Sequence, residues 1–173
     1  MQFKEITSEV LVANGPLAQV GRADIELLKK KAAANPRRRV RICAHRENAD
    51  RIHEMLIVLV GDCYIRPHKH FGKSESLHLI EGSASAVFFD DTGAVTEVAP
   101  LGDYSSGHPF YYRLEVPRFH TLLIHSDFLV FHETTNGPFN RADTAFAPWS
   151  PEETDLAGRQ RFMKTLTEAV RKP

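Results

Sequence analysis

Short hydrophobic runs dominate most of this chain. From about residue 39 to 147, runs rich in β-branched and aromatic residues alternate with Gly, Asp, Asn and Pro, a pattern typical of strands joined by tight turns. About eight such runs at close intervals predict an all-β sandwich or barrel. The runs are VRICAH, MLIVLV, SLHLIEG, SAVFFD, AVTEVAPL, FYYRLEV, FHTLLIHS and FLVFHETT.

Two segments outside these runs have helical signals. Residues 24–35 carry apolar side chains at helical spacing and end just before a proline, which predicts one short helix. Near the C-terminus, Ser150 at N-cap, Pro151 at N1 and Glu153 at N3 resemble a capping box. We therefore expect a second helix from about Pro151 to Val170, packed against the β domain or a second subunit.

The order of these elements predicts one structural domain with three parts. Residues 1–36 form an N-terminal arm and helix, residues 37–149 a β-barrel, and residues 150–173 the C-terminal helix. Within the barrel, the sequence FFDDTGAVTEV predicts a hairpin, because Asp-Thr-Gly lies between two strand-like runs.

Composition narrows the class of ligand and the compartment. Lys plus Arg equals Asp plus Glu at 22 each, so no overall field favours nucleic acid or an anionic membrane, and a small-molecule ligand fits better. Two cysteines are too few for a disulfide framework or a cysteine zinc site. The first residues lack the layout of a signal peptide, and no run approaches a membrane span. We therefore expect a cytoplasmic protein with reduced thiols.

The stretch from Gly61 to Gly82 carries the clearest chemical signal. His68 and His70 are two residues apart and are followed five residues later by Glu75. Because residues i and i+2 of a strand face the same way, the two imidazoles can reach one ion. By the same parity His78 faces the opposite side from Glu75, so it is a reserve ligand at best.

These residues resemble the first motif of the cupin superfamily: HxH, four residues, Glu, six residues, Gly. The resemblance implies a cupin double-stranded β-helix, that is, a jelly-roll barrel, with the two histidines and Glu75 as metal ligands. The second cupin motif is similar to EVPRFHTLLI, which adds His120 as the fourth ligand. His125 lies five residues further on and should point away from the ion.

The chain is more narrowly similar to the WbuC family of cupin-fold metalloproteins. The segments that carry this resemblance are NPRRRVRICAH, YIRPHKH, ESLHLIEG, VFFDDTGAVTE and FAPWSPEE, which span roughly residues 35 to 153. WbuC-like cupins are associated with bacterial surface-polysaccharide gene sets, so the resemblance implies a sugar or nucleotide-sugar ligand. Cupins commonly dimerise through sheet edges, and we expect a homodimer.

Strand parity also predicts a substrate pocket. Tyr64 and Arg66 share the parity of His68 and should project beside the ion. Arg66 is the first candidate to bind an anionic group, because its guanidinium can grip carboxylate or phosphate; a salt bridge that closes the barrel is the alternative. Tyr111, Tyr112 and Trp149 are expected in the core, without a ligand role.

A second set of pocket candidates lies on the strand that begins near Arg39. One face of this strand carries Arg39, Arg41, Cys43 and His45, and we expect that face to line the pocket. Arg41 is then a pocket residue, and His45 contacts the substrate or supports a residue that does. The alternative for His45 is a surface histidine. The run from Arg37 to Arg39 either clamps a diphosphate or forms a solvated face.

Three imidazoles and a carboxylate with open coordination positions are typical of a catalytic ion: Fe, Mn, Ni and Zn all fit. Our leading hypothesis is a metal-dependent enzyme, isomerase- or epimerase-like or dioxygenase-like, with its catalytic residues unknown. The alternatives are a non-catalytic module that binds a metal and a ligand to regulate or scaffold another protein, and a structural β-domain with no site. A general base near the ion would favour the enzyme, and His45 is the candidate in the sequence.

Overall fold

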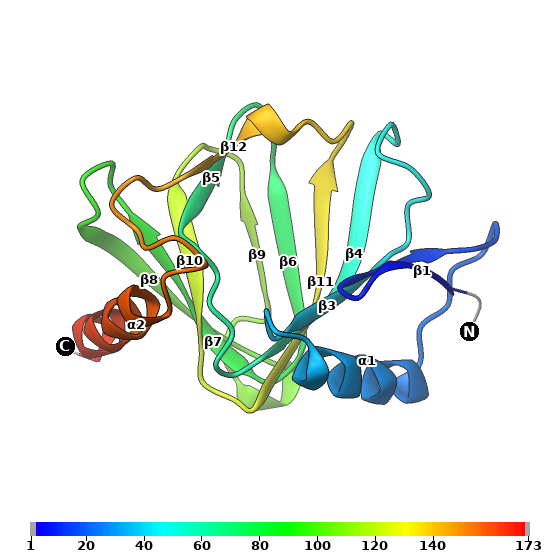
Figure 1. The fold of residues 1–173 in the computed structure, drawn as a ribbon, viewed down its shortest axis with the longest axis horizontal. Coiled ribbons are helices and arrows are strands. Elements are labelled where there is room, and N and C mark those ends of the chain that lie inside the picture. The colour runs from blue at the N-terminus through cyan, green and yellow to red at the C-terminus, as the bar shows by residue number, and fades with distance from the viewer. Residues whose placement is uncertain (1–2, 172–173) are drawn as a thin grey trace.

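Two sheets face each other in the computed structural model, which describes residues 3–171. One sheet has seven strands in the order β1-β2-β3-β4-β11-β6-β9, and the other has five in the order β12-β5-β10-β7-β8. Figure 1 shows the two sheets meeting along the floor of the molecule and opening upward. The mostly β jelly-roll prediction is confirmed.

The eight predicted runs correspond to eight strands of the structure. Their bounds are β3 Arg39–Cys43, β4 Ile52–Val60, β6 Glu75–Glu81, β7 Ser83–Phe89, β8 Val95–Gly102, β9 Tyr111–Leu114, β10 Phe119–Ile124 and β11 Phe128–Asn136. The predicted hairpin joins β7 and β8, and Asp90 Oδ1 accepts hydrogen bonds from the backbone of Thr92 and Ala94 at 2.8 and 3.0 Å.

Four shorter strands complete the sheets. They are β1 Phe3–Thr7, β2 Val10–Ala13, β5 His68–His70 and β12 Thr144–Phe146. The sequence predicted the arm before residue 36 without strands, but β1 and β2 form a hairpin and β2 pairs in parallel with β3. This hairpin extends the seven-stranded sheet beyond the barrel.

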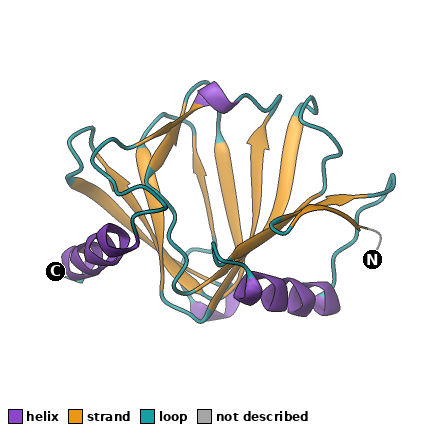
Figure 2. Ribbon diagram, viewed as in Figure 1, coloured by secondary structure: helices purple, strands orange, loops and turns teal. Residues whose placement is uncertain are grey.

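Each helix covers the outer face of one sheet, as Figure 2 shows. Helix α1, Arg22–Ala34, packs Leu28 and Ala32 against the seven-stranded sheet, as predicted. Helix α2, Leu156–Val170, packs Leu166 against the five-stranded sheet. Among residues 3–171, neither helix is long and apolar enough to cross a membrane.

The predicted start of the second helix is wrong by about one turn. Asp155 is the N-cap, and its Oδ1 accepts from the backbone N–H of Gly158 at 2.9 Å. Ser150 instead donates to the carbonyl of Ala147 at 2.7 Å. Glu153 forms ion pairs with arginines, so the capping-box residues serve tertiary contacts and the chain stays irregular until Asp155.

An apolar core lies between the two sheets. Leu77 and Leu79 of β6 and Phe131 of β11 meet Ala86 of β7 and Leu122 of β10, all buried. Leu77, Leu122 and Phe131 also line the cavity described below, so this core borders the cavity.

Candidate metal centre

Four predicted ligands converge where the two sheets approach each other. His68 and His70 lie on β5, His120 lies directly opposite His68 on β10, and Glu75 begins β6 on the other sheet. One ligand atom from each of the four lies within 4.8 Å of the others. Two nitrogen or oxygen ligands of one zinc ion, each about 2.0–2.2 Å from it, are at most about 4.4 Å apart, so the cluster has nearly the span that one ion requires.

The Nδ1 atoms of all three histidines are already engaged on the outside of the cluster. Those of His68 and His120 lie 2.9 Å from the carbonyls of Arg66 and Arg118, and that of His70 lies 3.0 Å from Thr144 Oγ1. A carbonyl can only accept, so the Nδ1 of His68 and His120 carries a proton, and the Nε2 atom is the one that faces the cluster. Metal-ligating histidines are oriented in this way. The donor set therefore fits a divalent ion.

Glu75 closes the cluster from the side of β6. Its carboxylate oxygens lie 3.3 Å from His70 Nε2 and 3.6 Å from His120 Nε2. Burial alone would raise the pKa of Glu75, but hydrogen bonds with His120 and His70 hold that pKa well below its usual range. Burial, together with the neighbouring His120, lowers the pKa of His68 to about 3. Burial lowers the pKa of His120, but the Glu75 carboxylate raises it by more. The cluster thus offers an ionised carboxylate and, at His68, a neutral imidazole, and metal binding would displace a proton from His120.

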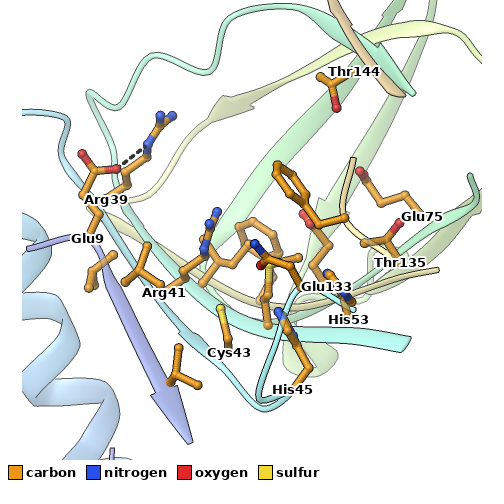
Figure 3. A pocket seen from close by; sticks show the side chains of 18 of the residues that line it. Glu9, Arg39, Arg41, Cys43, His45, His53, Glu75, Glu133, Thr135 and Thr144 are labelled. Atoms are coloured by element: carbon orange, nitrogen blue, oxygen red, sulfur yellow. Dashed lines mark hydrogen bonds and ion pairs between the residues drawn. The ribbon is translucent and has the colours of Figure 1, made fainter. Parts of the chain in front are cut away.

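The cluster forms one wall of a cavity of about 1480 Å³. Figure 3 shows Arg41, Cys43 and His45 on a different wall from Glu75. Arg39, Arg41, Cys43 and His45 all line the cavity, as strand parity predicted, while Val40 and Ile42 point to the opposite face and pack with α1. His45 stacks on His53 with ring centroids 4.1 Å apart. The inward position of His45 matches the prediction, whereas its role stays a prediction.

Tyr64 does not reach the cavity, which corrects the sequence prediction. The residue is 4% exposed, its hydroxyl donates to the carbonyl of Pro151 at 3.0 Å, and its ring packs edge-on against Phe162 of α2. Residues 64–67 are irregular and β5 begins only at His68, so strand parity does not extend back to Tyr64.

Arg66 borders the cavity, but its guanidinium is held by other protein groups. It lies 2.6 Å from Glu152 and 3.1 Å from Ser150 Oγ, and it stacks over Phe146 at 5.1 Å. This is the salt-bridge alternative that the sequence left open. An anion-binding role for Arg66 stays a prediction that these contacts do not favour.

The arginines at positions 37–39, which follow α1, also form ion pairs. Arg37 and Arg39 both contact Glu9 and Glu153, and Arg38 contacts Asp62 at 2.8 Å. These contacts anchor the N-terminal hairpin and the segment before α2 to β3.

Two remaining histidines point away from the cluster, as their spacing predicted. His78 is exposed on the outer face of β6 beside Phe110. His125 follows β10 and its Nε2 lies 2.8 Å from Ser85 Oγ.

Tyr112 and Glu133 are among the cavity residues that sequence reasoning missed. The Tyr112 hydroxyl donates to Glu75 Oε1 at 3.4 Å. Glu133 faces the cavity from β11, and burial, with a further contribution from the charge of Glu75, raises its pKa to about 8. A signal for Glu133 existed: in FLVFHETT it shares strand parity with Leu129 and Phe131, both buried.

Comparison with known proteins supports the fold. Residues 20–101 match a family model described as "Domain of unknown function (DUF6016)", and no curated protein matches. Protein SO0799 from Shewanella oneidensis is similar in structure, with 14% identity, a TM-score of 0.53, and coverage of 77% of this chain and 86% of that one. DMSP lyase DddQ from Ruegeria pomeroyi DSS-3 is 14% identical, with a TM-score of 0.50 and coverage of 66% and 54%.

The capsular polysaccharide assembling protein CapF from Staphylococcus aureus is a more distant match. It is 16% identical with a TM-score of 0.48, and the matched part covers 62% of this chain but 31% of CapF. The similarity to SO0799 and DddQ supports the fold, and the chain has the cupin jelly-roll fold. Membership of the WbuC family stays a prediction.

Proposed function

We propose that His68, His70, Glu75 and His120 hold one divalent metal ion, and that the chain is a metal-dependent enzyme acting on a small polar metabolite. One observation carries the proposal: three imidazoles with outward-bonded Nδ1 atoms and one ionised carboxylate converge on the wall of a cavity of about 1480 Å³. Structural sites are closed by protein ligands, whereas a site that opens on a cavity leaves coordination positions for a substrate.

The ligand set is compatible with Fe, Mn, Ni or Zn. Such an ion would polarise a substrate oxygen or lower the pKa of a bound water. Isomerase- or epimerase-like and dioxygenase-like reactions both need this kind of site, and our proposal covers both classes.

The cavity also contains acid–base groups besides the ligands, which favours an enzyme over a non-catalytic binding module. His45 was the candidate in the sequence, and Glu133 and Tyr112 join it on the cavity wall. Of these three groups, Glu133 is the one whose pKa burial shifts toward neutrality, and groups with such shifts gather at catalytic sites. A module that only stores an ion or a ligand has no need of a buried carboxyl with a pKa of about 8.

The substrate class follows from the size of the cavity and the WbuC resemblance. Pockets for small molecules commonly measure about 300–1,000 Å³, so this cavity has room for a sugar or a nucleotide sugar. The chain would then act on a sugar-derived metabolite of bacterial surface polysaccharide. We further propose that the protein is cytoplasmic and forms a homodimer through its sheet edges.

Metal analysis tests the central claim. We expect about one equivalent of metal in purified protein, a lower melting temperature after chelation, and loss of metal from His120→Ala and Glu75→Gln. His78→Ala is the matched control, because His78 lies on the outer face of the strand that carries Glu75. Metal far below one equivalent with a melting temperature indifferent to chelation would refute the site. Anomalous scattering from a crystal would identify the ion.

A further inference from the structure

The basic residues around the cavity divide into paired and unpaired groups. Arg37 and Arg39 share Glu9 and Glu153, Arg66 pairs with Glu152, and Lys73 lies 3.6 Å from Asp143. Arg41 differs from these four, as do Lys4 and Arg46, which also line the cavity. Within residues 3–171, no carboxylate lies within 4.0 Å of the Arg41 guanidinium, although its side chain borders the cavity.

Strand register places Arg41 on the inner surface of the seven-stranded sheet. It lies opposite Ile57 of β4, two residues from Cys43, and Cys43 lies opposite Met55, which in turn lies opposite Glu133 of β11. Figure 3 shows Arg41 beside Cys43, with Glu133 facing the same space. Arg41 is exposed, and its side chain borders the cavity.

The nearest acidic group does not neutralise Arg41 by direct contact. Glu133 faces the same cavity but forms no ion pair with Arg41. The Arg41 charge is thus available for a ligand.

The distance from Arg41 to the metal cluster sets the size of that ligand. Arg41 is on β3 and Glu75 is on β6, with β4 and β11 between them. Three strand spacings amount to roughly 14 Å across the sheet. The register places Arg41 level with Leu79, four residues from Glu75, which adds roughly 13 Å along the strands. The two backbones are thus roughly 19 Å apart, and a ligand that bridges the two side chains is on the order of 10–15 Å long.

From this placement we propose that Arg41 is the anchor for a carboxylate or phosphate group of the ligand, with Glu133 facing the same group. The opposite end of the ligand would present an oxygen to the cluster of His68, His70, Glu75 and His120. The inference rests on the proposed function for its second contact only. It narrows the substrate to an elongated anion with a polar end, such as a phosphorylated or carboxylated sugar.

The test is titration calorimetry of the full chain, first in metal-free form with inorganic phosphate and with acetate as probes. We expect Arg41→Met to weaken binding of the preferred probe by about tenfold or more, because a charge-assisted contact is lost. Arg37→Met is the matched control: it removes the same charge from the cavity rim, where Arg39 still pairs with Glu9 and Glu153. We expect its affinity to stay within about twofold of the wild type. The tighter of the two probes identifies the group as phosphate or carboxylate.

A second arm uses protein loaded with Zn²⁺ and the long dicarboxylate suberate. Suberate should bind more tightly than acetate to the wild type and lose that advantage in Arg41→Met. Wild-type affinity in Arg41→Met, an equal loss in Arg37→Met, or no binding of either small anion would overturn the inference. Arg41-dependent phosphate binding by a protein that fails to take up metal would support the anchor and refute the metal site alone.

Discussion

Tyr112 donates a hydrogen bond to Glu75, with 3.4 Å between Oη and Oε1. The two residues lie on neighbouring strands, β9 and β6, and Tyr112 is aligned with Leu77, two residues after Glu75. Burial and the nearby Glu75 charge raise the pKa of Tyr112 well above its usual value, so the phenol keeps its proton. Tyr112 therefore orients a carboxylate that we propose as a metal ligand.

Removal of this hydroxyl should weaken metal binding without abolishing it. Partners that orient metal ligands typically contribute about 10- to 100-fold in metal affinity. A hydrogen bond of 3.4 Å is long and therefore weak. We thus expect Tyr112→Phe to raise the metal Kd by about tenfold. Competition with a chromogenic chelator measures the change. Tyr111→Phe is the control, because Tyr111 faces outward and bonds Ser76; an equal effect in both variants would contradict the orienting role.

Glu133 should make the metal-free protein less stable as the pH rises. Its pKa is about 4.5 in the unfolded chain and about 8 in the fold. A raised pKa means that the folded state binds the proton more tightly, so its contribution to stability is fully present below pH 4.5. That contribution is lost progressively as the pH rises through about 8.

We therefore expect Glu133→Gln to be more stable than the wild type above pH 8 by about 2–4 kcal/mol, with a smaller difference at pH 5. Urea unfolding of the metal-free proteins across this pH range measures the difference. Glu47→Gln, a change of an exposed residue, is the control and should follow the wild type. A constant difference between Glu133→Gln and wild type at all pH values would show that the carboxyl does not titrate as described.

Local patterns account for most of the fold and part of the site. The eight long strands and α1 follow from alternation, turn residues and helical spacing, which are properties of neighbouring residues. His68, His70 and Glu75 were predicted because they lie within eight residues on one hairpin-like segment. His120 required the family resemblance, because only the pairing of β10 with β5 places it opposite His68.

The errors arose where tertiary contacts override local pattern. The prediction for Tyr64 assumed that a strand continues back from His68. Residues 64–67 instead form hydrogen bonds with residues 147–152 and belong to no strand. Ser150 and Glu153 are residue types that favour a helix N-terminus, but here they make tertiary contacts. Ser150 donates a hydrogen bond to the carbonyl of Ala147, and Glu153 pairs with Arg39 of β3. Glu133 was placed within a predicted strand, but its position on the cavity depends on the pairing of β11 with β4 and β6, which local pattern does not show.

Arg66 should contribute to stability more than to metal binding. Its guanidinium joins the irregular segment before β5 to Ser150, Glu152 and the carbonyl of Ala147. We expect Arg66→Ala to lower the free energy of unfolding by about 1–3 kcal/mol, because Ser150 and the carbonyl lose a charged donor. Metal content should stay at the wild-type level. Glu152→Ala, which removes an exposed partner, should cost less than about 1 kcal/mol. Loss of metal from Arg66→Ala would place this side chain in the site itself.

Gly82 is the last residue of the motif that begins at His68. Its replacement by any residue with a side chain should greatly reduce stability. Its φ of +97° is rare for residues with a side chain, and a Cβ there would overlap the carbonyl oxygen of Phe128 and Ser126 Oγ. Gly72 is the matched control, because its φ is also positive, +64°, while a Cβ would meet nothing within 4 Å. We expect Gly82→Ala to lower the free energy of unfolding by about 3 kcal/mol or more and Gly72→Ala by about 1 kcal/mol. Urea unfolding measures both. Equal losses would mean that backbone conformation alone sets the requirement, whereas a larger loss at Gly82 shows that the close approach of β11 to the turn between β6 and β7 requires glycine.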